Sequence, residues 1–169
     1  WRPLVLVLGI AALLRLVALD TPLYIDEITT LTVASQPLSR MGDVMRLIDA
    51  SPALFPLVLH VWLAVGRSDA WVRLLPALLG LASVYVAYRV GRQAYGPRAG
   101  LLAALVVAMA PAHVHYAQYV RNYSLLTLAA GVQMLLFLRW FDQPRHSAAE
   151  IAAFGVSTAA LVYSHYLGL

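Results

Sequence analysis

Two adjacent carboxylates, Asp26 and Glu27, stand in the segment "PLYIDEITTLTVAS", directly after a long apolar run. A carboxylate at such a boundary suits a general base that takes the proton of a hydroxyl group. An acid beside it can tune the first or join it in binding a divalent cation. The alternative is structural, with both acids in solvent or at the N-terminus of a helix that begins at "ITTLT". Tyr24, just before the pair, favours a functional site.

A second group of reactive side chains lies in "PAHVHYAQYVRNYSLL", residues 111–126. The fixed fork of the Arg121 guanidinium suits the oxygens of a phosphate. Tyr116, Gln118 and Tyr123 are candidate substrate contacts beside it. The alternative is an aromatic belt at a membrane interface, with an arginine that reaches out to the water.

Three further candidates stand at the ends of apolar stretches. Arg73 lies in "WVRLLPALLG", and His165 and Tyr166 lie in "VYSHYLG". Each is either a substrate contact or an ordinary interfacial residue. Arg15, inside the first apolar stretch, is predicted to extend outward to the membrane surface.

The elements that position these residues follow from composition. Hydrophobic residues make up 62% of the 169 residues and charged residues 12%, whereas soluble domains contain about 25% charged residues. The apolar residues form long runs, which is typical of helices that span a bilayer. The fold class is therefore an all-α, polytopic transmembrane bundle. Cysteine is absent, which excludes thiolate-bound metals, and no pattern of interleaved aromatic and basic residues indicates nucleic-acid binding.

Charge predicts the topology. The stretch 89–98 holds three arginines and no acid, whereas 20–49 holds five of the eight acids. Cytoplasmic loops collect Arg and Lys, so 89–98 and 139–150 are predicted to be cytoplasmic and 20–49 to lie outside.

The stretch 52–66 is the weakest candidate for a span, because its 15 residues include Pro56 and would rise only about 22 Å as a helix. Placing it in the interface, or as a re-entrant segment of an outer loop 20–70, keeps the charges on their predicted sides. The outer loop also contains an amphipathic segment, "SRMGDVMRLIDASP", that suits an interfacial helix. About five spans remain: 3–19, 71–88, 99–117, 124–141 and 149–167.

The order of these motifs resembles the N-terminal half of membrane GT-C glycosyltransferases. The similarity is to the family-39-like group that contains protein O-mannosyltransferases and aminoarabinose transferases. It rests on "YIDE", on the run from "SPALFPLVLHVW" to "HVHYAQYVRNYSLL", and on "VYSHYLG". We therefore expect this chain to be the N-terminal part of a longer protein with a single transmembrane module.

The resemblance implies an inverting transferase in the plasma membrane that uses a polyprenyl-phosphate sugar donor and a hydroxyl acceptor on the extracytoplasmic face. It assigns the catalytic carboxylate to Asp26, with Glu27 beside it, and implies no certain cofactor apart from a possible divalent cation. The chain departs from the family pattern at Ser51-Pro52-Ala53, where relatives often have a basic residue and two prolines. It departs again at Tyr119, where relatives often have a second acid. A transporter or flippase of lipid-linked sugars and a non-catalytic assembly subunit are the alternatives.

Overall fold

In a computed structural model of the chain, residues 2–17, 19–48, 52–141 and 146–164 are described. Every regular element in these ranges is a helix, which confirms the predicted all-α class. The helices are α1 (Arg2–Leu16), α2 (Ile25–Ala34), α3 (Leu38–Ile48), α4 (Leu54–Trp62), α5 (Asp69–Tyr95), α6 (Pro97–Met109), α7 (Pro111–Ala117), α8 (Tyr123–Phe141) and α9 (Ala148–Ser164).

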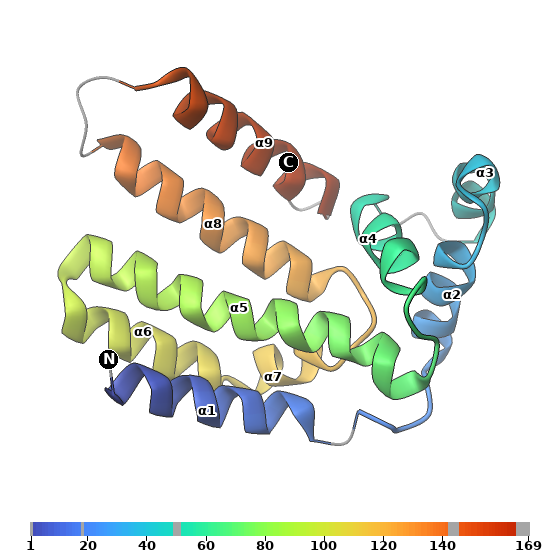
Figure 1. The fold of residues 1–169 in the computed structure, drawn as a ribbon, viewed down its shortest axis with the longest axis horizontal. Helices are drawn as coiled ribbons and strands as arrows, with labels where there is room; N and C mark the ends of the chain where they lie inside the picture. Colours follow the sequence, from blue (N-terminus) through green and yellow to red (C-terminus); the bar gives the residue numbers. More distant parts are fainter. Residues whose placement is uncertain (1, 18, 49–51, 142–145, 165–169) are drawn as a thin grey trace.

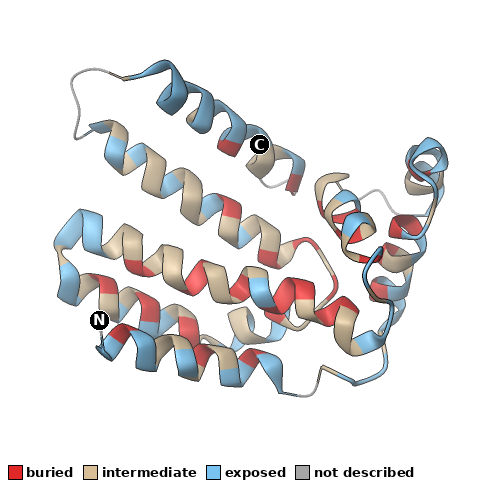
Figure 2. Ribbon diagram, in the orientation of Figure 1, coloured by how far each residue is buried: buried red, intermediate tan, exposed pale blue. Residues whose placement is uncertain are grey.

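The long helix α5 is the centre of the bundle. It packs against α1, α6, α7 and α8, while α9 packs on α8 (Figure 1). A buried apolar cluster joins α1, α5 and α6, and includes Ala11, Val84 and Ala108. Buried residues run along α5 and the faces turned toward it, whereas α9 is mostly exposed (Figure 2). Exposed apolar side chains on α9, such as Ile151 and Val156, suit contact with lipid.

The hairpin between α5 and α6 is built by local sequence. Gly96 ends α5 with a φ of 89°, a conformation that only glycine adopts without strain. Pro97 then occupies the first turn of α6, where a missing N–H costs nothing. The close packing that follows needs Gly100, because a Cβ there would lie 2.6 Å from the carbonyl oxygen of Tyr88.

Within the described residues, fewer spans are found than the five expected. By length and composition, α5 with 27 residues and α8 with 19 residues can cross a membrane, and α6 with α7 form a third span if the bent pair counts as one. α1 has 15 residues and α9 has 17. Helices of these lengths rise about 22 and 26 Å, less than a hydrocarbon core of about 30 Å.

The expected span 99–117 is broken, and Arg15 explains how the break is stabilised. α6 and α7 meet at an angle of 64°, because Pro111 cannot donate a hydrogen bond to the carbonyl of Val107. Arg15 supplies the missing donors, with Nη2 at 3.0 Å from Val107 O and Nη1 at 3.0 Å from Ala108 O. The prediction that Arg15 extends outward is therefore wrong: its side chain is fully buried and also contacts His113 Nδ1 at 3.0 Å.

The helices α2, α3 and α4 gather beyond one end of the bundle (Figure 1). α2 and α4 share a buried apolar cluster with the start of α5 and with Val120. Trp62 and Trp71 stack at 4.6 Å between ring centroids and exchange indole-to-carbonyl hydrogen bonds, so α4 is fixed against α5. The nine residues of α4 rise only about 14 Å, too short to cross a membrane; whether α4 lies in the interface stays a prediction.

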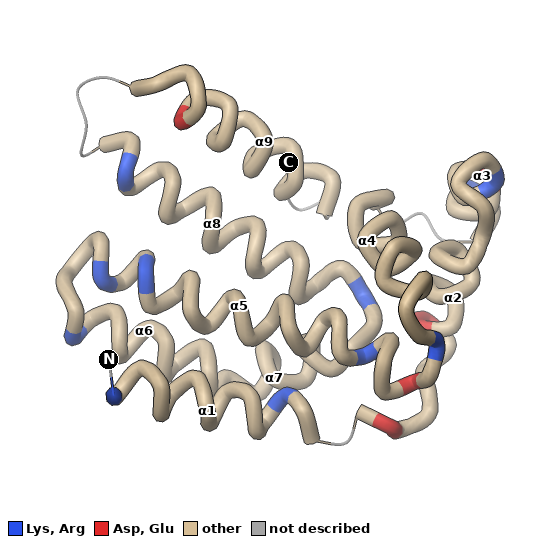
Figure 3. Tube along the Cα trace, viewed as in Figure 1, with Lys and Arg blue, Asp and Glu red and all other residues tan. Residues whose placement is uncertain are grey.

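The two ends of the bundle differ in charge. Among the described residues, the end that carries the α5–α6 connection, the start of α1 and the end of α8 is rich in arginine, and Glu150 lies there in the first turn of α9 (Figure 3). The opposite end, around α2, mixes both signs (Figure 3). The arginine-rich end is the one that the sequence predicts to be cytoplasmic, and α2 lies at the end that it predicts to be outside.

Candidate active site

The first turn of α2 carries both carboxylates and separates them. Glu27 accepts a hydrogen bond from the backbone N–H of Tyr24 at 2.8 Å, which satisfies one of the unpaired donors at the helix N-terminus. The helix begins at Ile25, earlier than the "ITTLT" start expected, so both acids lie inside its first turn. The side chain of Glu27 is fully buried, whereas Asp26 is exposed.

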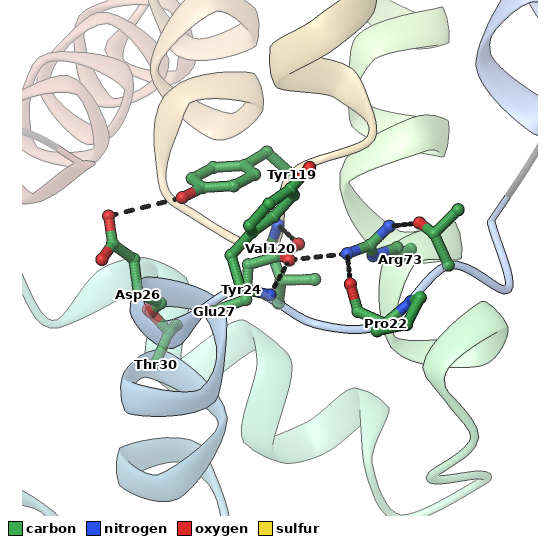
Figure 4. Close-up of polar contacts among 9 residues, drawn as sticks. Pro22, Tyr24, Asp26, Glu27, Thr30, Arg73, Tyr119 and Val120 are labelled. Carbon is green, nitrogen blue, oxygen red and sulfur yellow. Dashed lines mark hydrogen bonds and ion pairs between the residues drawn. The ribbon is translucent and has the colours of Figure 1, made fainter.

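Glu27 connects three segments of the chain (Figure 4). Its Oε2 lies 2.6 Å from Arg73 Nη2 in a buried ion pair, and its Oε1 accepts the backbone N–H of Val120 at 2.9 Å. Arg73 in turn donates to the carbonyl of Pro22 at 2.9 Å and to the hydroxyl of Thr21. The Glu27–Arg73 pair therefore ties the segment before α2 to α5 and to the turn after α7.

This pairing bears on the suggested divalent cation. The carboxylate of Glu27 faces two backbone donors and a guanidinium, which are groups that repel a cation. Among the described residues, no group of three or more His, Asp or Glu side chains is arranged to hold a metal ion. The residues around Asp26 and Glu27 do not fit a cation shared between the two acids.

Asp26 faces a hollow of about 440 Å³. Its lining residues are Tyr24, Asp26, His115, Tyr116, Tyr119 and Tyr123. Tyr119 donates its hydroxyl to Asp26 Oδ2 at 3.3 Å (Figure 4). The carboxylate is thus open on one side and oriented by a phenol on the other.

The Tyr119 phenol stays protonated at neutral pH. Burial raises the pKa of Tyr119, and the neighbouring carboxylate of Asp26 raises it further. Each effect disfavours a phenolate beside an anion. Tyr119 is therefore a stable hydrogen-bond donor to Asp26.

Arg121 lies behind this hollow and does not line it. Its Nη1 donates to the hydroxyl of Thr30 at 3.0 Å and to the backbone carbonyl of Asp26 at 3.4 Å. The guanidinium of Arg121 therefore contacts α2 at Thr30, one turn after the carboxylates. It also contacts the backbone of Asp26.

The remaining candidates have different positions. Gln118 caps the C-terminal end of α1, because its Nε2 donates to the carbonyls of Leu14 at 3.1 Å and Val17 at 2.8 Å. Tyr123 packs against Tyr116 in the hollow, with ring centroids 4.4 Å apart. His165 and Tyr166 lie outside the described residues. The preceding Ser164 accepts a hydrogen bond at its carbonyl from Asn122 Nδ2 at 2.8 Å, so α9 ends beside the turn after α7.

Sequence reasoning did not select His115 or Tyr119 as site residues. They stand four positions apart around the end of α7, and residues at this spacing share one face of a helix. Their rings lie 5.8 Å apart. The four-residue spacing of His115 and Tyr119 is the feature of the sequence that could have identified them. It places both residues on one face, and that face is turned toward Asp26.

Comparisons with known proteins add the family. A sequence model of the dolichyl-phosphate-mannose-protein mannosyltransferase family matches residues 50–167. Arg73, Tyr119 and Arg121 fall inside this range, and the carboxylates of α2 lie before it. No curated protein and no solved structure matches the chain. Since the match covers well over half of its residues, the chain belongs to the dolichyl-phosphate-mannose-protein mannosyltransferase family, and is an integral membrane glycosyltransferase of the GT-C type.

Proposed function

We propose that this protein transfers a sugar from a polyprenyl-phosphate donor to a hydroxyl acceptor on the extracytoplasmic face, with Asp26 as the general base. The observation that carries the proposal is the open carboxylate of Asp26 in the tyrosine-lined hollow, oriented by Tyr119. The family supplies the reaction class, and the charge asymmetry of the bundle supports the outer face.

The proposed reaction is a single displacement. The Asp26 carboxylate takes the proton of the acceptor hydroxyl, and the acceptor oxygen attacks the anomeric carbon of the donor sugar. The bond between that carbon and the phosphate oxygen breaks, and polyprenyl phosphate leaves with the bonding electron pair. The proton on Asp26 then passes to solvent. One displacement at the anomeric carbon inverts its configuration.

The other charged residues have supporting roles in this proposal. Glu27 and Arg73 form the buried pair that holds α2 against α5 and Val120, so they position Asp26. Arg121, which contacts the backbone of Asp26, is the proposed contact of the donor phosphate, since a guanidinium stabilises charge that develops on a leaving phosphate.

The test is Asp26→Asn in the full-length protein, reconstituted in lipid nanodiscs with a labelled polyprenyl-phosphate sugar. Loss of a general base lowers the rate about 10²- to 10⁴-fold, measured as release of polyprenyl phosphate. The matched control is Asp43→Asn, the same change at an exposed acid of α3, which is expected to retain the wild-type rate. Release by Asp26→Asn within a few-fold of wild type would overturn the assignment.

The same assay separates the proposal from its rivals. A transporter of lipid-linked sugars moves the intact donor, and a non-catalytic subunit leaves it unchanged. Neither releases polyprenyl phosphate in an acceptor-dependent manner.

A further inference from the structure

The geometry beside Asp26 points to the acceptor: we propose that the hollow binds a carbohydrate ring, which carries the hydroxyl that Asp26 deprotonates. This inference rests on the proposed function and names its acceptor class. The hollow is defined by Tyr24, Asp26, His115, Tyr116, Tyr119 and Tyr123.

The first support is a continuous series of aromatic rings. Tyr24 lies 5.8 Å from Tyr119, and Tyr119 lies 5.8 Å from His115. His115 lies 5.3 Å from Tyr116, and Tyr116 lies 4.4 Å from Tyr123. The rings thus pack stacked, tilted or edge to face against one another, which restrains them. Tyr24 and Tyr116 are 61% and 41% exposed, so part of this ring surface is open to a ligand.

Charge decides which substrate the hollow accepts. Asp26 is the single formally charged residue in its lining, and no arginine of the described chain lines it. A phosphate brought against this carboxylate would meet like charge in a partly desolvated site. The hollow therefore does not suit the phosphate end of the donor. It suits an uncharged or cationic acceptor that offers a hydroxyl to Asp26.

The chemistry of the lining favours a sugar over a peptide. One face of a sugar ring presents C–H groups that pack on an aromatic ring, and its hydroxyls bond to phenols and a carboxylate. A volume of about 440 Å³ is of the size that binds small ligands.

An extended peptide is usually held through backbone hydrogen bonds. Two adjacent backbone donors are already engaged, since Val120 N bonds to Glu27 Oε1 at 2.9 Å and Arg121 N to the carbonyl of Tyr119 at 2.7 Å. These two N–H groups are therefore not available to the backbone of an extended peptide.

The experiment measures acceptor-dependent release of polyprenyl phosphate by the full-length protein. The acceptor probes are methyl α-D-mannopyranoside, methyl β-D-glucopyranoside and a capped peptide that contains Ser and Thr. We expect saturable stimulation by at least one glycoside and none by the peptide. Stimulation by the peptide with both glycosides inert overturns the carbohydrate inference and leaves the proposed function standing. No release with any probe, together with no difference between wild type and Asp26→Asn, overturns the proposed function itself.

Substitutions of the rings test the site directly. Tyr24→Leu and Tyr116→Leu are expected to raise the glycoside KM about three- to tenfold, the size of an aromatic stacking contact, with a smaller effect on kcat. Tyr116→Phe keeps the ring and removes only the hydroxyl, so it is expected to raise the glycoside KM less than Tyr116→Leu does. Tyr95→Leu is the matched control, because Tyr95 is 87% exposed at the far end of α5. Equal glycoside KM values for Tyr116→Leu and Tyr116→Phe would overturn the stacking role.

Discussion

The two faces of the first turn of α2 differ in almost every physical respect. On the Glu27 face, a carboxylate is fully buried and receives an arginine and two backbone N–H groups. On the Asp26 face, a carboxylate is exposed in a hollow of tyrosine rings with one phenol as its partner. Consecutive residues of a helix point about 100° apart, so adjacent acids can have separate environments and separate roles.

The contrast between Asp26 and Glu27 shows that two adjacent acids need not act together. A carboxylate whose charge is compensated on all sides holds segments together and has little left to offer a substrate. A carboxylate with one hydrogen-bond donor and an open side can accept a proton. We therefore expect the Glu27 face to govern stability and the Asp26 face to govern the reaction.

Glu27→Gln has the largest expected effect on stability, since it breaks the buried ion pair with Arg73. It also places the amide N–H₂ of glutamine against a group that is itself a hydrogen-bond donor. We expect the free energy of unfolding to fall by about 3–5 kcal/mol, measured by denaturant titration in detergent. Asp26→Asn is the comparison, and its unfolding is expected to stay within about 0.5 kcal/mol of wild type.

The double variant Glu27→Met/Arg73→Met sharpens this result. It removes both charges together, and we expect it to be more stable than Glu27→Gln because no arginine is left buried without a partner. Wild-type unfolding in Glu27→Gln, or a large loss of stability in Asp26→Asn, would reverse the assignment of the two faces.

Arg15→Met is expected to have the second largest effect. It leaves the carbonyls of Val107 and Ala108 without the donors that Arg15 supplies beside Pro111, and we expect a loss of about 1–3 kcal/mol. Arg46→Met is the control, because Arg46 forms an exposed pair with Asp43 on α3, which contributes little.

Because α7 leads into the turn that contacts both faces, activity should fall along with stability in Arg15→Met. An Arg15→Met protein with unchanged unfolding would show that the break at Pro111 needs no side-chain donor.

Tyr119→Phe has the smallest expected effect, and it acts on the Asp26 face alone. Removing the phenol takes away the hydrogen bond that orients the carboxylate of Asp26. We therefore expect kcat to fall about two- to tenfold, with unchanged unfolding.

Tyr163→Phe on α9, at an exposed position, is the control for Tyr119→Phe. A kcat of Tyr119→Phe equal to that of the wild type would mean that the phenol does not orient the base.

Much of the helical organisation could be predicted from hydrophobic runs and charge. The predicted spans 71–88 and 124–141 lie within or nearly match α5 and α8, because long apolar segments form helices whatever their neighbours. The span 99–117 was predicted without its bend at Pro111. A proline marks a possible kink, but the donor that stabilises this one comes from Arg15, over ninety residues earlier in the chain.

The structure places the predicted site residues in different surroundings. Asp26, Tyr116 and Tyr123 line one hollow, and their part in a reaction stays a prediction. Arg73 and Gln118, also selected as substrate contacts, bond instead to Glu27 and to the end of α1. Both arginine and glutamine have long side chains that bond equally well to a ligand or to the protein, and sequence spacing does not distinguish these partners.

By itself, the sequence determined that this protein is a helical membrane chain with an acidic pair and a tyrosine-rich turn. Apolar content, helix length and charge are properties of local segments, and they act before any packing is known. Only the tertiary structure decided which acid is buried and which is open. That choice depends on Arg73 and Val120, which lie 46 and 93 residues away along the chain and meet Glu27 only when α5 and the turn after α7 pack against α2.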